Sequence, residues 1–218
     1  MPNQLTQEFV LGAIRETPWD FGNQVLYDLC RAHHDHNRDD VIIAKVWLIG
    51  RSYAAAIERR RIPGAWTGDE FYERHVAPII RSSGIDSWFD HLGKSVGQDP
   101  ALDLEVHQRL TRLFTEISNL EKRSLASKYL HFHFPERFYI YDSRAAESIR
   151  KLTTTVSTKS VLLRNHDDIY AAFYLRCWQL RERLAQFAGQ DLSPREIDKV
   201  LLAYSRMRAV GPLQSPQV

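Results

Sequence analysis

ALDLEVHQRLTRLFTEISNLE, residues 101–121, is the stretch that decides the fold class. Its apolar residues recur in alternating steps of four and three, and its opposite face is charged, as in a helix with one buried side. The buried face comprises Leu102, Val106, Leu110, Leu113, Ile117 and Leu120. The spacing predicts a long helix over Ala101–Glu121, and similar patterns on both sides of it predict an all-α fold.

A second helix, predicted from Asp39 to about Arg61, is apolar nearly all round, and Pro63 and Gly64 supply its stop. These two helices form the predicted centre of a compact domain of roughly nine or ten helices. The glycine-punctuated region 84–97 is predicted to be irregular. Further helices are expected over residues 20–36, 69–80, 124–134, 142–152, 167–188 and 193–208.

Composition predicts one folding unit. The chain has 218 residues, of which 44% are hydrophobic and 26% charged, so we expect a packed core over residues 1–210, with room for two lobes, and a disordered tail over 211–218. No apolar stretch reaches the roughly 20 residues of a membrane span, and no signal peptide is recognised, which predicts a cytoplasmic protein without a membrane partner. The net charge of +2 neither demands nor excludes DNA as a partner.

The most unusual stretch is KRSLASKYLHFHFPERFYIYDSR, residues 122–144. It resembles the helix-hairpin-helix DNA glycosylase and base-excision lyase superfamily, in which a helix with an Ala-Ser pair leads to a short apolar link that ends in a catalytic aspartate. The matching residues are Ala126, Ser127, Tyr129, Leu130, Phe132, Ile140, Tyr141 and Asp142. The resemblance implies a protein that binds DNA or hydrolyses a damaged or modified base from it, without a cofactor.

Asp142 is the catalytic residue that this resemblance implies. A carboxylate at a helix N-terminus is oriented by backbone N–H groups, and such an anion can face a cationic deoxyribose. An extruded base would then lie in an aromatic pocket, for which Trp47, Tyr53 and Tyr141 are the candidates. The alternative interpretation makes Asp142 an ordinary N-cap.

Basic residues suggest where DNA would bind. Arg51, Lys122, Arg123 and Lys128 are predicted phosphate contacts, and Ser124 is grouped with them. The 118–123 hairpin has no glycine, and the best match places Ser124 where the lyase members carry a lysine. The resemblance therefore implies a monofunctional enzyme rather than a Schiff-base lyase.

Two other functions stay open. The first is a catalytically inactive nucleic-acid-binding or interaction protein of the same fold. The second follows from Arg31 and His36, which fit the Arg-x4-His pattern of the HEPN ribonucleases. The spacing of His33, His34 and His36 does not indicate a metal site, and none is predicted.

Overall fold

A computed structural model describes residues 5–59, 66–95, 97, 99–156 and 165–210 of the chain. These residues form an all-helical protein, and none of them belongs to a β-strand. Because α4, η1 and α5 run on without a break, the described chain contains ten helices, as the sequence predicted. No helix among the described residues is long and apolar enough to cross a membrane.

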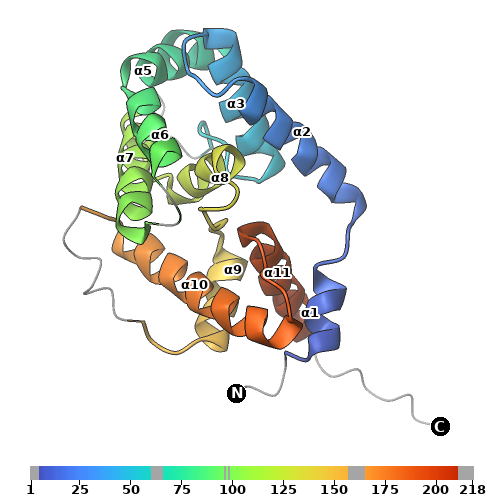
Figure 1. Cartoon of the computed structure of the whole chain (residues 1–218). Helices are drawn as coiled ribbons and strands as arrows, with labels where there is room; N and C mark the ends of the chain where they lie inside the picture. The colour runs from blue at the N-terminus through green and yellow to red at the C-terminus, as the bar shows by residue number, and fades with distance from the viewer. Residues whose placement is uncertain (1–4, 60–65, 96, 98, 157–164, 211–218) are drawn as a thin grey trace.

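The helices follow one another as drawn in Figure 1. Their bounds are α1 Gln7–Ala13, α2 Pro18–Ala32, α3 Asp39–Ser52, α4 Gly68–Phe71, the π-helical η1 Tyr72–Val76, α5 Ala77–Ser82, α6 Ile85–Lys94, α7 Pro100–Ser118, α8 Arg123–His133, α9 Ser143–Leu152, α10 Asp168–Ala188 and α11 Pro194–Val210.

The helix predicted from Asp39 to Arg61 is shorter than expected, because α3 ends at Ser52. The chain turns back at Ala54, whose φ of 51° lies in the left-handed region. It then passes so close to Gly50 that a Cβ on Gly50 would lie 2.9 Å from the Cα of Ala56. Small residues thus permit a reversal instead of a longer helix. The predicted stop at residues 63 and 64 lies outside the described residues, as does the predicted 211–218 tail.

Two further expectations need correction. The region 84–97 is not wholly irregular, since α6 occupies Ile85–Lys94 behind a left-handed Gly84. The short helix α1, capped by Thr6, was not predicted at all. At the end of α7 the left-handed position that glycine often fills is taken by Asn119, with φ 56°, so the hairpin into α8 forms without glycine.

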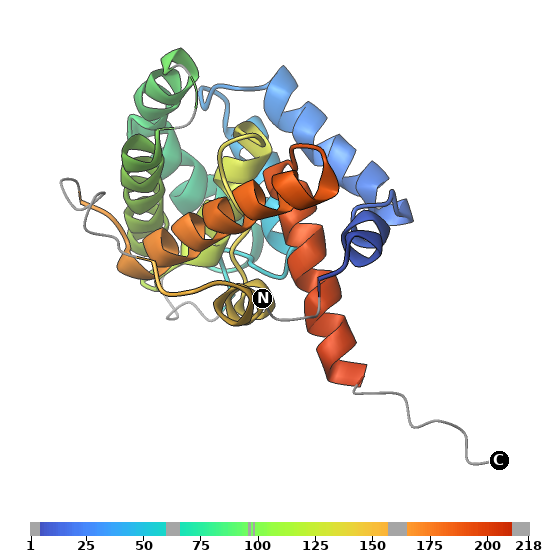
Figure 2. The ribbon, with the colours of Figure 1, turned by 60° about the horizontal axis from the view of Figure 1, so that its bottom comes forward.

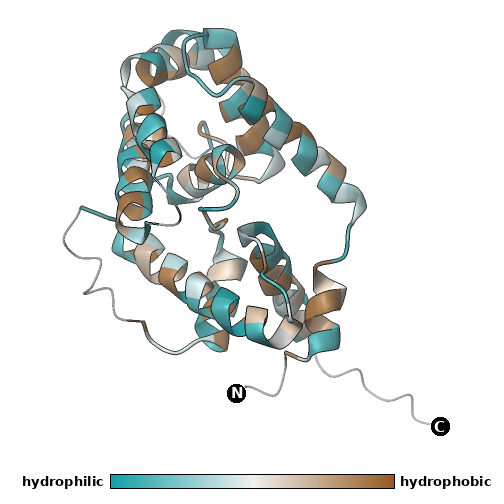
Figure 3. Cartoon of the chain, viewed as in Figure 1, coloured by the Kyte–Doolittle hydropathy of each residue, from teal (hydrophilic) through white to brown (hydrophobic). Residues whose placement is uncertain are grey.

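The buried apolar residues divide into two cores. One is built mainly by α2 to α8, here called the N-lobe, and the other mainly by α1 and α9 to α11, here called the C-lobe. Figure 1 shows the N-lobe above the C-lobe, and Figure 2 turns the C-lobe helices toward the viewer. Brown apolar and teal polar residues alternate along most helices in Figure 3, as one-sided burial requires.

A buried ion pair, here called the clasp, ties the lobes together. Asp103 on α7 accepts hydrogen bonds from Arg137 at 2.6 and 2.8 Å through one oxygen and from the Tyr174 hydroxyl of α10 at 2.7 Å through the other. Arg137 also donates to the Leu92 carbonyl and the Ser95 hydroxyl. Both oxygens of the buried carboxylate are therefore satisfied.

Candidate functional site

The link between α8 and α9 begins with a turn at residues 135–137 and then has no regular secondary structure, and Phe138, Tyr139 and Ile140 within it are buried. No strand among the described residues pairs with this link, so its backbone groups need other partners. The Tyr170 hydroxyl donates to the Tyr139 carbonyl at 3.0 Å, and several further partners come from one face of α8.

That face is a polar stripe on α8, formed by Ser124, Ser127, Lys128 and His131, with the i, i+3, i+4, i+7 spacing of one helix side. The Ser124 hydroxyl and the Lys128 ammonium donate to the Tyr141 carbonyl at 3.0 and 2.7 Å. The Tyr141 N–H donates to the Ser127 hydroxyl at 3.0 Å. The stripe thus fixes the last residue before Asp142.

His131 completes the stripe from a fully buried position. Its Nδ1 lies 2.8 Å from the Phe138 carbonyl, which can only accept, so Nδ1 carries the proton. Nε2 then accepts from the Tyr27 hydroxyl at 2.6 Å. Burial lowers the pKa of His131 to about 4, although the bond to Phe138 opposes the shift, so the ring is neutral near pH 7.

Asp142 is the N-cap of α9, as predicted. Its backbone is extended, and Oδ1 accepts from the Ala145 N–H at 2.7 Å. The stripe therefore positions the residue before the carboxylate, and the first turn of α9 orients the carboxylate itself. The side chain is partly exposed, which leaves it accessible from solvent.

Lys128 lies inside the protein rather than on its surface, with an exposed fraction of 1%. Besides Tyr141, its ammonium contacts the Ser124 hydroxyl at 2.7 Å. Burial lowers the pKa of Lys128 to about 8, while the negative charge of Asp142 acts in the opposite direction. The lysine is thus an internal cation paired electrostatically with Asp142.

A second carboxylate, Asp198 of α11, was not singled out from the sequence. It is buried, and its Oδ2 accepts from Arg195 at 2.5 Å. Burial raises the pKa of Asp198 to about 6; Arg195 opposes that rise, and the nearby charge of Asp142 adds to it. Lys128, Asp142, Arg195 and Asp198 together are called the carboxylate cluster below.

The carboxylate cluster contains two buried atoms without a hydrogen-bond partner among the described residues, Asp198 Oδ1 and Arg195 Nε. Buried polar atoms are nearly always paired, and unpaired ones gather where ligands or reactive groups act. The sequence did carry a signal for Asp198. Residues 194, 197 and 201 are buried at helical spacing, and an acidic residue at 198 falls on the same face.

Two of the three residues predicted to line an aromatic pocket, Tyr53 and Tyr141, lie near Lys128, and the pocket itself stays a prediction. The ring of Tyr53 lies 5.9 Å from the Lys128 ammonium and its hydroxyl donates to Asn23 at 2.6 Å. Tyr141 adjoins the same lysine through its carbonyl. Trp47 is instead 43% exposed on α3, with the Arg51 guanidinium 5.7 Å from its ring centroid.

The other predicted DNA contacts all have partners within the protein. Arg51 pairs with Glu58 at 2.5 Å, and Lys122 donates to the Arg59 carbonyl at 2.7 Å. Arg123 donates to Asp167, the N-cap of α10, at 2.5 Å and also pairs with Glu121. Contacts of these side chains with DNA stay a prediction.

The Arg31 and His36 pair does not form a ribonuclease-like site in this chain. His36 is buried, with Nδ1 2.6 Å from Asp86 and Nε2 2.8 Å from the Tyr129 hydroxyl, whereas Arg31 is exposed and pairs with Asp28. Both ring nitrogens of His36 are therefore occupied. Within the described part of the chain, no group of three or more His, Cys, Asp or Glu side chains could hold a metal ion.

Comparisons with known protein families, with curated proteins and with solved structures found no match to this chain.

Proposed function

We propose that the protein binds DNA and acts on the bond between deoxyribose and a damaged or modified base, with Asp142 as its key carboxylate. The observation that supports this most directly is the placement of Asp142. It lies at the start of α9, partly exposed, with its direction fixed by the Ala145 N–H and with a buried cation, Lys128, behind it.

The proposed chemistry follows from charge. As the base leaves, the sugar develops positive charge, and a pre-oriented carboxylate lowers the energy of that state because it need not reorganise. Asp142 can also accept a proton from the attacking water. Lys128, fixed by the Tyr141 carbonyl and the Ser124 hydroxyl, is a positioning residue for this carboxylate.

The experiment is the release of free base from DNA carrying damaged or modified bases, followed by alkaline cleavage to reveal abasic sites. Asp142→Asn keeps the helix cap, since asparagine caps almost as well as aspartate, but removes the negative charge. We expect a folded protein that has lost base release completely, with some loss of stability because the buried Lys128 loses the favourable charge of Asp142.

A matched control is Asp99→Asn. Asp99 caps α7 in the same way, with Oδ1 accepting from the N–H groups of Ala101 and Leu102. This variant should keep both stability and activity. Base release that survives Asp142→Asn would refute the role of Asp142. A wild-type protein that binds DNA but releases no base from any substrate would support the inactive binding protein instead.

A further inference from the structure

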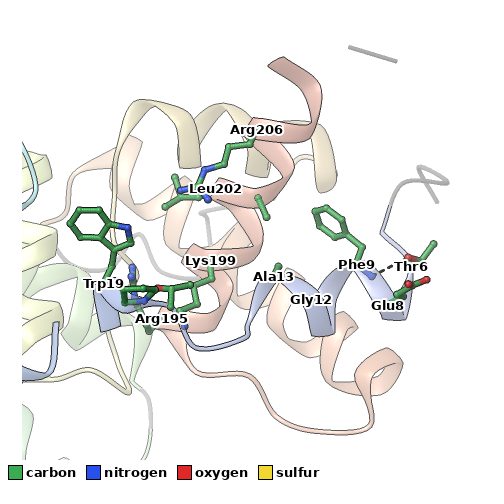
Figure 4. Close-up of a pocket in the computed structure, with 13 residues that line it drawn as sticks. Thr6, Glu8, Phe9, Gly12, Ala13, Trp19, Arg195, Lys199, Leu202 and Arg206 are labelled. Carbon is green, nitrogen blue, oxygen red and sulfur yellow. Dashed lines mark hydrogen bonds between the residues drawn. The ribbon is translucent and has the colours of Figure 1, made fainter. Parts of the chain in front are cut away.

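A groove runs between α1 and α11 on the C-lobe (Figure 4). It encloses about 960 Å³, which is at the upper end of the roughly 300–1,000 Å³ typical of ligand pockets. Figure 4 shows Trp19 at one end of the groove and Thr6 and Glu8 at the other. None of these residues was assigned a function from the sequence.

The wall formed by α1 is open near its C-terminal end, because the two lining residues there are small. A Cβ placed on Gly12 would meet no atom within 4 Å, and the next residue is Ala13. On the opposite wall, Leu202 and Ala203 of α11 leave space at the same level. The groove is therefore a feature of the backbone arrangement that side chains do not fill.

The α11 wall is basic. Arg195, Lys199 and Arg206 all line the groove, and their spacing of four and seven residues places them on one side of the helix. Lys199 is held by Asp20 at 2.8 Å and Arg195 by Asp198 at 2.5 Å, so two of the cations have fixed positions, while Arg206 is exposed. Lys199 also donates to the Ile14 and Arg15 carbonyls, so the groove presents one exposed cation, Arg206, beside two partly exposed cations that already have partners within the protein.

An exposed aromatic ring lies at one end of the groove. Trp19 is 80% exposed, the highest value among the large hydrophobic side chains that the structure describes as exposed. Proteins bind single-stranded nucleic acid with a row of cations along the phosphate backbone and an exposed aromatic ring. An unpaired base stacks on the ring while the phosphates contact the cations.

The groove also adjoins the carboxylate cluster. Arg195 lines the groove and donates to Asp198, whose charge interacts with those of Lys128 and Asp142. A strand in the groove would therefore lie next to the proposed reaction centre. An enzyme that acts on an extruded base needs to hold the unpaired nucleotides beside it.

We propose that the groove between α1 and α11 binds a single-stranded segment of DNA, with one base stacked on Trp19 and phosphates along Arg195, Lys199 and Arg206. This inference rests on the proposed function, since it assigns the unpaired strand of the same substrate to this surface. Stacking on a tryptophan requires a base that is not paired, so single strands should bind here in preference to duplex.

The test is the binding of a fluorescent twelve-residue oligothymidylate, and of a twelve-base-pair duplex, to wild-type protein and to groove variants. Trp19→Ala should weaken single-strand binding about 5- to 100-fold, as expected for the loss of one stacked base. Arg206→Glu should weaken it and reduce its salt dependence. Gly12→Glu, which places a negative charge in the open space, should weaken it further.

Two of the variants have matched controls at exposed positions outside the groove lining. Phe21→Ala removes an aromatic ring of 78% exposure from the same helix as Trp19, and Arg208→Glu reverses a charge on the same helix as Arg206. Both should bind within twofold of wild type. Gly12→Ala lies in the groove and adds a methyl group without charge, so it should weaken binding less than Gly12→Glu does. Circular dichroism establishes that every variant is folded.

The outcomes separate this inference from the proposed function. Folded groove variants that bind the single strand as well as wild type does, while base release continues, would refute the groove and leave the function intact. A wild-type protein that binds neither single strand nor duplex would refute both. Polyglutamate that competes as effectively as the oligonucleotide would show an anion groove without base stacking, which would also refute the inference.

Discussion

The clasp and the carboxylate cluster are both polar networks between the lobes, but they differ in how fully their atoms are paired. In the clasp, Asp103 uses both oxygens and Arg137 binds three different groups. In the cluster, Asp198 Oδ1 and Arg195 Nε have no partner among the described residues. A fully paired buried network stabilises one structure, whereas an incompletely paired one marks a place where something else binds or reacts.

The largest expected effect comes from making the same substitution in both networks. In Asp103→Asn the Tyr174 hydroxyl can turn to accept from the new amide, but the buried Arg137 guanidinium loses its counter-charge. We expect a loss of about 3 to 5 kcal/mol in the free energy of unfolding. In Asp198→Asn the amide nitrogen can occupy the position of the unpaired Oδ1, and Arg195 still has an ion pair with Asp20 at 3.9 Å. The loss in the free energy of unfolding should therefore be under about 2 kcal/mol.

Urea unfolding of both variants measures this difference. The exposed Arg38–Asp40 pair supplies the control, because Arg38→Ala should leave the free energy of unfolding nearly unchanged. Equal losses at Asp103 and Asp198 would show that the two networks do not differ as their hydrogen bonds indicate.

The second prediction concerns Lys128, which joins the carboxylate cluster to the polar stripe of α8. Lys128→Met keeps most of the side-chain volume but removes the ammonium. The Tyr141 carbonyl would still accept from Ser124, so we expect a loss of about 1 to 3 kcal/mol. Base release should fall as well, because the residue preceding Asp142 is held less firmly.

Lys151→Met is the matched control for this substitution. Lys151 pairs with Glu147 one turn away on the exposed side of α9, and such exposed pairs contribute little to stability. Thermal unfolding and the base-release assay should both give wild-type values for this variant. An unchanged Lys128→Met protein would remove Lys128 from the positioning role.

Helical spacing and caps predicted the elements of this fold well, because they depend on residues near one another in the sequence. The helix predicted over 193–208 begins with a capping box of Ser193 and Glu196, and Asp142 and Asp167 cap the helices predicted over 142–152 and 167–188. The early end of α3 was missed because it depends on the contact between Gly50 and the returning chain at Ala56.

The candidate site was predictable only in part, for a related reason. Asp142 could be found because its cap lies within a recognisable motif. The approach of Asp198 depends on α11, which follows α8 by about sixty residues of sequence. No local sequence pattern predicts which face of α11 lies near Asp142, so this part of the site required the three-dimensional structure.

The last prediction concerns acid and the polar stripe. The pKa of His131 is about 4 in the folded protein, against an ordinary value of 6.5, so unfolding takes up a proton at this ring between these pH values. The stability that comes from the neutral ring is therefore complete above pH 6.5 and is lost as the pH falls toward 4. Within that window His131 contributes up to about 1.4 kcal/mol per pH unit.

Two variants isolate this contribution from those of the other histidines. His131→Asn keeps a donor near the Phe138 carbonyl but cannot titrate, so its free energy of unfolding should fall less steeply with acid than that of wild type, by the equivalent of one proton. Tyr27→Phe removes the hydroxyl that donates to the same ring but leaves the ring in place, so the steep slope should persist. Urea unfolding at intervals from pH 7 to pH 4.5 measures both. If His131→Asn and wild type had parallel curves, the ring would not be the neutral, buried acceptor that the polar stripe requires.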